Sequence, residues 1–177
     1  MGLKKGGKLA RIKLMPTTDK LKSLVLMVDD SDDDGTLLEL AFQKLEQFRL
    51  VGRVTDGHQA IAYLKGEGDF VNRRKYPMPN ILLLDLRMPR LDGFDVLEWL
   101  RTQSFPQLRV VVFSGSDCRE DVEKALGMGA HLYRTKPLRF DEQVSMLKAL
   151  EIHIGCLQPA SIRARLEQKS IQRDLNL

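Results

Sequence analysis

Five polar residues follow the short, largely apolar segments of this sequence, and together they could carry out phosphoryl chemistry. Asp29 and Asp30 end one apolar run, Asp85 follows a second and Ser114 follows a third, while Lys136 follows a shorter segment. If these segments are parallel strands, their carboxyl ends meet at one sheet edge, where functional groups of open α/β sheets gather. The pattern therefore predicts three carboxylates, a hydroxyl and an amine at a single site.

The three carboxylates of this predicted site would repel one another unless a cation lay between them. Hard oxygen ligands suit Mg²⁺, so Asp29, Asp30 and Asp85 predict a magnesium site completed by water and backbone. A metal there would neutralise a transferring phosphoryl group and orient it for in-line attack. Asp85 is the candidate nucleophile, because it follows the central apolar strand and precedes a turn that leaves it accessible. Lys136 and Ser114 could bind the remaining phosphoryl oxygens.

Hydrophobic periodicity predicts five strands that alternate with five helices. We expect strands over residues 24–29, 50–55, 81–85 and 108–113, and a short fifth strand before Lys136. We expect helices over residues 34–47, 57–64, 94–101, 119–127 and about 140–152. A polar loop of unusual length spans residues 65–80.

The alternation of these elements indicates the fold class. Strands that are apolar on both faces, between amphipathic helices, are typical of a parallel sheet covered on both sides. Right-handed crossovers then give a doubly wound five-stranded α/β domain. We expect this domain to span residues 23–152, between a flexible basic leader over 1–22 and a tail over 153–177 that could be helical.

Several motifs, in this order along the chain, closely resemble the receiver domain of response regulators. They are VDDSDDD, LLLDLRMPRLDGFDVL, VVFSGS and YRTKP, and the resemblance covers about residues 24–150. The resemblance implies a flavodoxin-like (βα)5 fold. It also implies a two-component phosphorelay protein that takes a phosphoryl group from a histidine kinase or phosphotransfer protein. The long 65–80 loop resembles the stand-alone subgroup that is similar to phytochrome-associated response regulators.

The resemblance also assigns roles to single residues. Asp85 resembles the phospho-acceptor, and Asp29 and Asp30 resemble the acid pair that binds the metal. The backbone carbonyl of Arg87 resembles a further metal ligand. Lys136 resembles the lysine that contacts the phosphoryl group.

The resemblance further implies a conformational switch. Ser114 resembles the switch hydroxyl, and Tyr133 resembles the switch aromatic that moves inward after phosphorylation. The peptide bond before Pro137 is expected to be cis by the same resemblance. The signal would pass to a downstream protein target through the face formed by the fourth helix, fifth strand and fifth helix, or through a homodimer formed by that face.

Charge and composition limit the other partners. The net charge is +4, but residues 1–23 alone carry seven Lys or Arg and one Asp, so the remainder is not basic. This distribution argues against sequence-specific nucleic-acid binding. No apolar run is long enough to cross a bilayer, and two cysteines without a CxxC pair fit a reducing cytoplasm. We therefore expect a cytoplasmic protein with no membrane partner, and expect removal of residues 1–20 to leave its melting temperature nearly unchanged.

Other classes of protein are less consistent with the motifs. A Mg²⁺-dependent phosphatase of the haloacid-dehalogenase type also uses an Asp nucleophile, but it needs a second Asp at the position of Arg87. A flavodoxin-type cofactor site would place phosphate beside the acidic 29–34 segment. A DNA-binding module does not fit in the residues after 150. We therefore expect a phospho-acceptor with at most slow self-dephosphorylation, not an enzyme.

Some polar residues near the motifs have simpler interpretations. Asp32, Asp33 and Asp34 are predicted to cap the first helix and complement its dipole, without a catalytic role. Asp117 could cap the helix at 119–127. The basic residues 73–75 are predicted to be a solvated loop tip.

Overall fold

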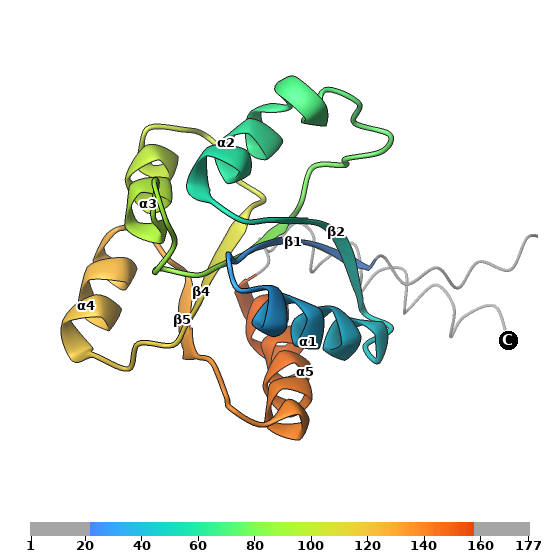
Figure 1. The fold of residues 1–177 in the computed structure, drawn as a ribbon, viewed down its shortest axis with the longest axis vertical. Helices are drawn as coiled ribbons and strands as arrows, with labels where there is room; N and C mark the ends of the chain where they lie inside the picture. Colours follow the sequence, from blue (N-terminus) through green and yellow to red (C-terminus); the bar gives the residue numbers. More distant parts are fainter. Residues whose placement is uncertain (1–21, 158–177) are drawn as a thin grey trace, which may run out of the picture.

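The computed structural model describes the backbone of residues 22–157 and the side chains of residues 22–150. Most of the predicted leader and the last part of the predicted tail therefore lie outside the described residues. The elements alternate as predicted (Figure 1), in the order β1 (Ser23–Val28), α1 (Asp32–Gln43), β2 (Phe48–Val54), α2 (Gly57–Lys65), a 3-10 turn (Gly68–Phe70), β3 (Ile81–Leu84), α3 (Gly93–Arg101), β4 (Arg109–Ser114), α4 (Arg119–Gly127), β5 (Leu132–Thr135) and α5 (Phe140–Leu157).

All five strands form one parallel sheet in the order β2-β1-β3-β4-β5. This is the flavodoxin-like order, in which β2 is added on one side of β1 and then β3, β4 and β5 are added on the other. The crossover places the ends of β1 and β3 next to each other, so the acids that follow these two strands become neighbours. The predicted doubly wound fold is confirmed.

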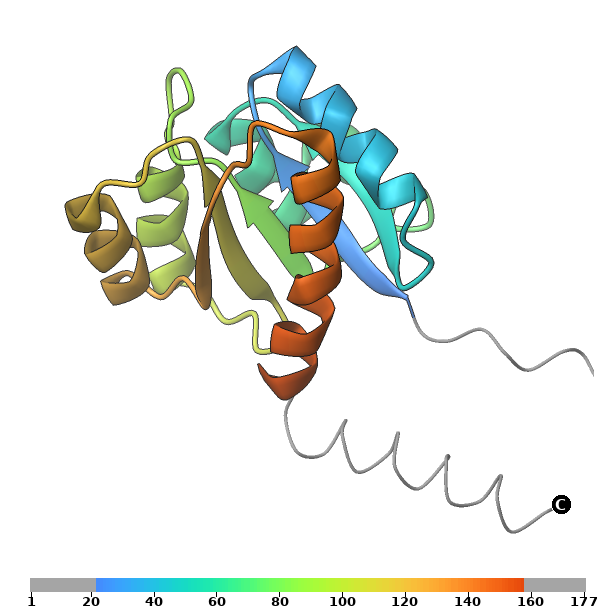
Figure 2. The same ribbon diagram turned by 90° about the horizontal axis from the view of Figure 1, so that it is seen from below.

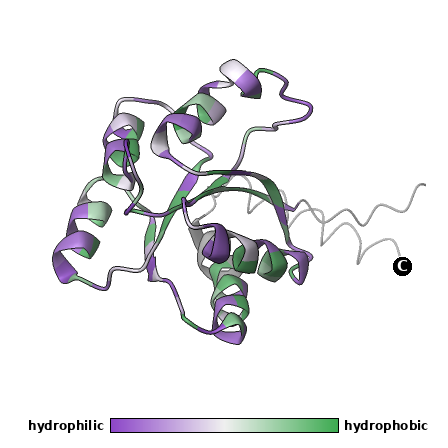
Figure 3. Cartoon of the chain, in the orientation of Figure 1, coloured by the Kyte–Doolittle hydropathy of each residue, from purple (hydrophilic) through white to green (hydrophobic). Residues whose placement is uncertain are grey.

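Helices cover both faces of the sheet, and each face has its own hydrophobic core. Side chains of α1 and α5 pack on one face with Val25, Leu83 and Val111 of the strands. Side chains of α2, α3 and α4 pack on the other face with Leu82 and Leu84. Figure 2 shows α1 and α5 side by side on their face of the sheet. In Figure 3 the strands are coloured hydrophobic while the helices carry hydrophilic residues, as expected for a doubly covered parallel sheet.

The helix starts differ in detail from the sequence prediction. Ser31 is the N-cap of α1, and its side chain accepts a hydrogen bond from the backbone N–H of Asp34. The three aspartates predicted to cap this helix instead fill its first turn, where their charge complements the dipole. Asp117 does not cap α4, because the N-cap is Cys118 and makes no side-chain capping bond.

The fifth helix is longer than predicted, since α5 ends at Leu157 and not near residue 152. The first part of the predicted tail is thus a continuation of α5. Its apolar residues Leu147 and Leu150 are buried against the sheet, which anchors the described part of the helix.

Candidate phosphoryl-transfer site

Three aspartates lie together at the carboxyl edge of the sheet. One carboxylate oxygen from each of Asp29, Asp30 and Asp85 lies within 4.8 Å of the others. Asp29 and Asp85 are buried at 2% and 7% exposure, whereas Asp30 is exposed. The sequence placed these residues at the ends of β1 and β3, and the parallel pairing of these strands brings them together.

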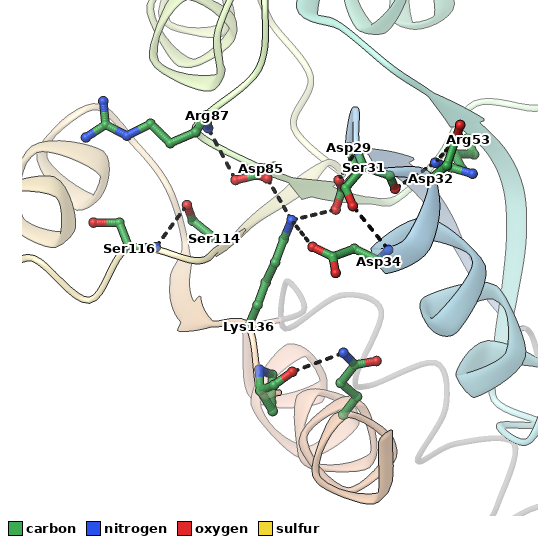
Figure 4. A network of polar contacts seen from close by, with 12 residues as sticks. Asp29, Ser31, Asp32, Asp34, Arg53, Asp85, Arg87, Ser114, Ser116 and Lys136 are labelled. Carbon is green, nitrogen blue, oxygen red and sulfur yellow. Dashed lines mark hydrogen bonds and ion pairs between the residues drawn. The ribbon is translucent and has the colours of Figure 1, made fainter. Parts of the chain in front are cut away.

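Lys136 reaches into this cluster from the segment after β5 (Figure 4). Its Nζ lies 2.8 Å from Oδ2 of Asp29, 2.7 Å from Oδ2 of Asp85 and 3.1 Å from Oδ2 of Asp34. Burial disfavours the charged ammonium, but the hydrogen bonds and charges of Asp29 and Asp85 outweigh burial and raise the pKa of Lys136. The lysine is therefore a cation at neutral pH, and it compensates part of the negative charge.

The pKa of Asp29 lies above its ordinary value, so the protein stabilises the protonated carboxyl relative to the carboxylate. Burial raises the pKa of Asp29, although Lys136 and the backbone N–H of Ser31 stabilise the ionised form. The Ser31 N–H donates to Oδ1 of Asp29 over 3.0 Å. The charge of Asp85 contributes to the raised pKa. A further cation at the cluster would relieve this unfavourable energy.

The backbone around Asp85 is closely packed. Its Oδ1 accepts a hydrogen bond of 3.2 Å from the N–H of Arg87, while its Oδ2 faces Lys136. The start of α3 passes so near that a Cβ at Gly93 would lie 2.2 Å from the carbonyl oxygen of Asp85. A side chain at Gly93 would therefore displace the strand end that carries Asp85.

Ser114 and Tyr133 lie on the side of the site formed by β4 and β5. Ser114 ends β4 and is fully buried, and its carbonyl accepts a hydrogen bond from the N–H of Lys136 over 2.8 Å. The hydroxyl of Tyr133 donates to the carbonyl of Ser116 over 2.7 Å, and only 8% of Tyr133 is exposed. Burial also raises the pKa of Tyr133. The aromatic side chain is thus already in an inward position.

The side chain of Arg87 points away from the aspartates in Figure 4. Its guanidinium forms an ion pair of 2.7 Å with Asp121 at the start of α4. Asp121 also accepts a 2.7 Å hydrogen bond from the hydroxyl of Ser116. The side chain of Arg87 therefore links the loop after β3 to α4, and the prediction concerning this residue rests on its backbone carbonyl alone.

Two expectations about this region were wrong. The described residues contain no cis peptide bond, so the bond between Lys136 and Pro137 is trans. Asp34, which was predicted to serve only the helix dipole, also contacts Lys136. The strand pattern could not reveal this contact, because Asp34 lies in the first turn of α1 and not at the end of a strand. The place of Asp34 in the first turn of α1, directly after the acids that end β1, is a signal that could have suggested the contact.

Comparison with known proteins identifies the family. The family model described as the response regulator receiver domain matches residues 25–148. The chain belongs to the response regulator receiver domain family. It is 30% identical to the response regulator Rcp1 of Synechocystis over 131 residues, which cover 72% of this chain and 86% of Rcp1. It is 31% identical to the probable methanogenesis regulatory protein FilR2 of Methanothrix harundinacea, over 67% of this chain and 75% of that protein.

Solved structures of receivers from phytochrome systems resemble this one. The response regulator RPA3017, in red light signalling of R. palustris, has a TM-score of 0.65 and 32% identity over 72% of this chain and 90% of that one. The phosphorylated cyanobacterial phytochrome response regulator RcpA has a TM-score of 0.64 and 29% identity over 73% of this chain and 91% of RcpA. The receiver is therefore a response regulator domain of two-component signalling, similar to phytochrome-associated members.

A metal-bound relative bears on the aspartate cluster. The Mn²⁺-bound form of Rcp1 has a TM-score of 0.60 and 28% identity over 73% of this chain and 91% of that one. The three carboxylates of the receiver described here are hard oxygen donors that suit a divalent cation. Among residues 22–157, no helix is long and apolar enough to cross a membrane.

Proposed function

We propose that Asp85 accepts a phosphoryl group from a histidine kinase or phosphotransfer protein. The observation that carries the proposal is the shared contact of Lys136 with Asp85 and Asp29, at 2.7 and 2.8 Å. A carboxylate oxygen of Asp85 attacks phosphorus as the P–N bond of the donor phosphohistidine breaks. The departing imidazole nitrogen keeps the electron pair of that bond. Lys136 then binds an oxygen of the new acyl phosphate.

We propose that Asp29, Asp30, Asp85 and the backbone carbonyl of Arg87 hold Mg²⁺ during this transfer. Bound there, the ion would neutralise charge on the phosphoryl oxygens. The raised pKa of Asp29 supports this proposal, because buried acids at close range favour a bound cation. The exposure of Asp30 leaves one side of the cluster open to the donor.

We propose that Ser114 and Tyr133 transmit the modification as a shift between two populations. The hydroxyl of Ser114 would bind the phosphoryl group and draw the end of β4 toward Asp85. Tyr133 here occupies the inward state, with its hydroxyl on the carbonyl of Ser116, and this is the state that the phosphorylated domain would favour. The altered face of α4, β5 and α5 then recruits a downstream protein or a second copy of the receiver.

Several charged residues of the α4–β5–α5 face already have partners within the domain. This favours a downstream protein as the partner of the face over a second copy held by ion pairs. Glu123 pairs with Arg119 at 2.7 Å, and Arg139 pairs with Asp141 at 3.1 Å. Lys124 lies 3.9 Å above the ring of Phe94. Sedimentation of the unmodified and beryllofluoride-treated protein would separate the two cases, since a dimer on treatment would support self-pairing.

We propose that the receiver is a phospho-acceptor and not a phosphatase of external substrates. A phosphatase of the haloacid-dehalogenase type would need a general acid at position 87. Arg87 cannot serve as that acid, and its side chain is engaged by Asp121.

The acceptor is tested by the variant Asp85→Asn. We expect the variant to lose labelling by acetyl phosphate or by a phosphorylated kinase, because the amide is not a nucleophile toward phosphorus. Asp33→Asn is the matched control, since Asp33 is exposed in the first turn of α1 and should still permit labelling. Intact-protein mass spectrometry measures both variants, and undiminished phosphate on Asp85→Asn would refute the assignment.

A further inference from the structure

The end of β2 holds the backbone on both sides of Asp30. Before Asp30, the N–H of Asp29 donates to the carbonyl of Val54 over 2.9 Å. After Asp30, the carbonyl of Ser31 accepts a 2.8 Å hydrogen bond from Nη2 of Arg53. Among the described residues, the carboxylate of Asp30 has no hydrogen-bond partner of its own, so its position depends on the backbone contacts of its neighbours. These also include the Ser31 N–H, which donates to Oδ1 of Asp29, and the Gly35 N–H, which shares the Ser31 carbonyl with Arg53.

The side chain of Arg53 is packed, although it comes from the neighbouring strand. It is 18% exposed and lies against α1, where its Nη2 also contacts Oδ1 of Asp32 at 3.0 Å (Figure 4). Its Nε is buried without a hydrogen-bond partner in the described part of the chain. An arginine in this setting is held in one place by its two contacts at Nη2 and by the helix surface beneath it.

The helix surface beneath Arg53 is formed by Gly35. A Cβ at Gly35 would lie 2.2 Å from Cζ of Arg53 and 2.3 Å from its Nε, which is too close for both to remain. The guanidinium therefore reaches the carbonyl of Ser31 only because position 35 has no side chain. A glycine inside a helix normally lowers the stability of the helix relative to alanine. The space that Arg53 requires gives a reason for a glycine at position 35.

From these contacts we infer that Arg53 is a positioning residue for the metal site, which holds the backbone of the loop from β1 to α1 so that Asp30 faces Asp29 and Asp85. The inference rests on the proposed divalent-cation site at these aspartates. Arg53 touches none of the three carboxylates directly. It acts through the carbonyl of Ser31, the next residue after Asp30.

Charge and geometry predict opposite effects of removing Arg53. Arg53 is a cation near an acidic cluster, so its charge alone would weaken metal binding, and its loss would strengthen it. If Arg53 positions the loop, its loss frees Asp30 and weakens binding. The direction of the change in metal affinity therefore distinguishes the two roles.

The experiment measures Mn²⁺ affinity by electron paramagnetic resonance of the free ion, below the melting transition of every variant. We expect Arg53→Ala to weaken binding about tenfold, as for other groups that orient metal ligands. Arg49→Ala is the matched control, because it removes the same charge from an exposed position on β2 and should change affinity less than about twofold through screened electrostatics. Asp30→Ala gives the affinity of a site that lacks this ligand.

Labelling by acetyl phosphate gives a second measurement. The Mg²⁺ concentration for half-maximal labelling of Arg53→Ala should rise by about the same tenfold factor. The labelling rate at saturating Mg²⁺ should return to that of the unmodified protein, because Asp85 and Lys136 are unchanged. A general loss of structure would instead lower the saturated rate.

Gly35→Ala tests the same contact from the helix. The new methyl group should displace the flexible guanidinium and reproduce the weaker Mn²⁺ binding, while the double variant with Arg53→Ala should bind no more weakly than either single variant. In the Arg53→Ala background, Gly35→Ala should raise the melting temperature by about 2–4 °C, since only the gain in helix propensity remains.

The outcomes separate this inference from the proposed function. If the unmodified protein binds no Mn²⁺, the proposed metal site fails and the inference fails with it. If the unmodified protein binds Mn²⁺ and Asp30→Ala does not, but Arg53→Ala binds as tightly or more tightly, only the positioning role of Arg53 is overturned. Additive losses in the double variant would also overturn the link between Gly35 and Arg53.

Discussion

Lys136 is the residue on which the charge balance of the site depends. Its ammonium is the only basic group among the described residues that contacts both Asp29 and Asp85, and its side chain is 11% exposed. Buried ion pairs of this kind contribute little relative to apolar packing, but removal of one partner leaves an uncompensated charge. The two buried carboxylates would then repel each other at close range.

The variant Lys136→Met should therefore be destabilised by about 3 kcal/mol in the presence of a chelator. Saturating Mg²⁺ should raise the melting temperature of this variant more than that of the unmodified protein, because the ion replaces the missing cation and no ammonium competes with it. Differential scanning fluorimetry with and without Mg²⁺ measures both effects. Lys148→Met removes an exposed lysine of α5 and is the control. Equal Mg²⁺ shifts in all three proteins would contradict this account.

At the scale of elements, the attachment of the 65–80 loop to α2 is a feature that the sequence did not predict. Its residues 73–75 were expected to be solvated, yet Arg73 donates to the carbonyls of Tyr63 and Leu64 at 2.7 and 2.8 Å. These carbonyls lie in the last turn of α2, where a cation complements the dipole, and the carbonyl of Tyr63 also accepts from the N–H of Gly66 over 3.1 Å. The interpretation as a solvated loop tip was wrong for Arg73. A run of basic residues does not reveal which of their side chains packs against the domain.

An aromatic cluster completes the attachment of this loop. The rings of Tyr63, Phe70 and Tyr76 lie 5.0 to 5.9 Å apart, and the hydroxyl of Tyr63 is within 3.2 Å of the Pro77 carbonyl. The loop is thus built onto α2, although it has little regular structure.

Arg73→Ala should destabilise the domain by about 2 kcal/mol, since two charge-assisted hydrogen bonds are lost and the C-terminus of α2 loses its partner. Hydrogen exchange should accelerate over residues 63–80, while labelling of Asp85 by acetyl phosphate should be unchanged because the loop lies away from the site. Arg74→Ala, at an exposed neighbouring position, is the control. Unchanged exchange in Arg73→Ala would show that the aromatic cluster alone holds the loop.

The strands and helices themselves were predictable for a physical reason. Strands such as Ile81–Leu84 are buried on both faces and therefore apolar throughout, and α3 is bounded by a capping box of Asp92 and Asp95. Their order along the chain, with right-handed crossovers, determines which strand ends meet. The aspartates and Lys136 were predictable for the same reason, since each ends or follows a strand.

Contacts that join residues distant in sequence were not predictable in this way. The contacts of Asp34 with Lys136 and of Arg53 with Ser31 depend on how a helix and a neighbouring strand are placed in three dimensions. The same is true of Asp56, a buried N-cap of α2 that pairs with Arg90 in the loop after β3. Arg90 has a positive φ of 70°.

At the scale of the whole molecule, the domain forms a single sheet with two cores, so loosening of one strand pair should affect the stability of the entire unit. The pairing of β4 with β5 is extended beyond the strands by His131. The imidazole Nδ1 of His131 accepts a 3.2 Å hydrogen bond from the backbone N–H of Val110. The backbone N–H of His131 donates to the Val110 carbonyl over 2.8 Å. Burial, together with the charge of Arg109, lowers the pKa of His131.

The lowered pKa makes the free energy of unfolding depend on pH. The folded protein binds a proton at His131 less readily than the unfolded chain, whose histidines titrate near pH 6.5. Above that pH both states carry a neutral imidazole and no effect arises. As pH falls below about 6.5, the unfolded chain takes up the proton first, so the folded state loses stability until the pH reaches the lower pKa of the folded state. A protonated Nδ1 would also lose its bond to the N–H of Val110.

Urea unfolding at a series of pH values between about 7.5 and 5.5 measures this effect, since most carboxylates remain ionised in that interval. We expect the free energy of unfolding to decrease toward the acidic end in the unmodified protein. His131→Gln keeps a side chain that can accept a hydrogen bond but does not titrate, so its decrease should be smaller. His58→Gln, on α2, is the matched control and should retain the dependence of the unmodified protein. If His131→Gln and the unmodified protein lose stability equally, the dependence arises elsewhere and the junction of β4 and β5 does not sense pH.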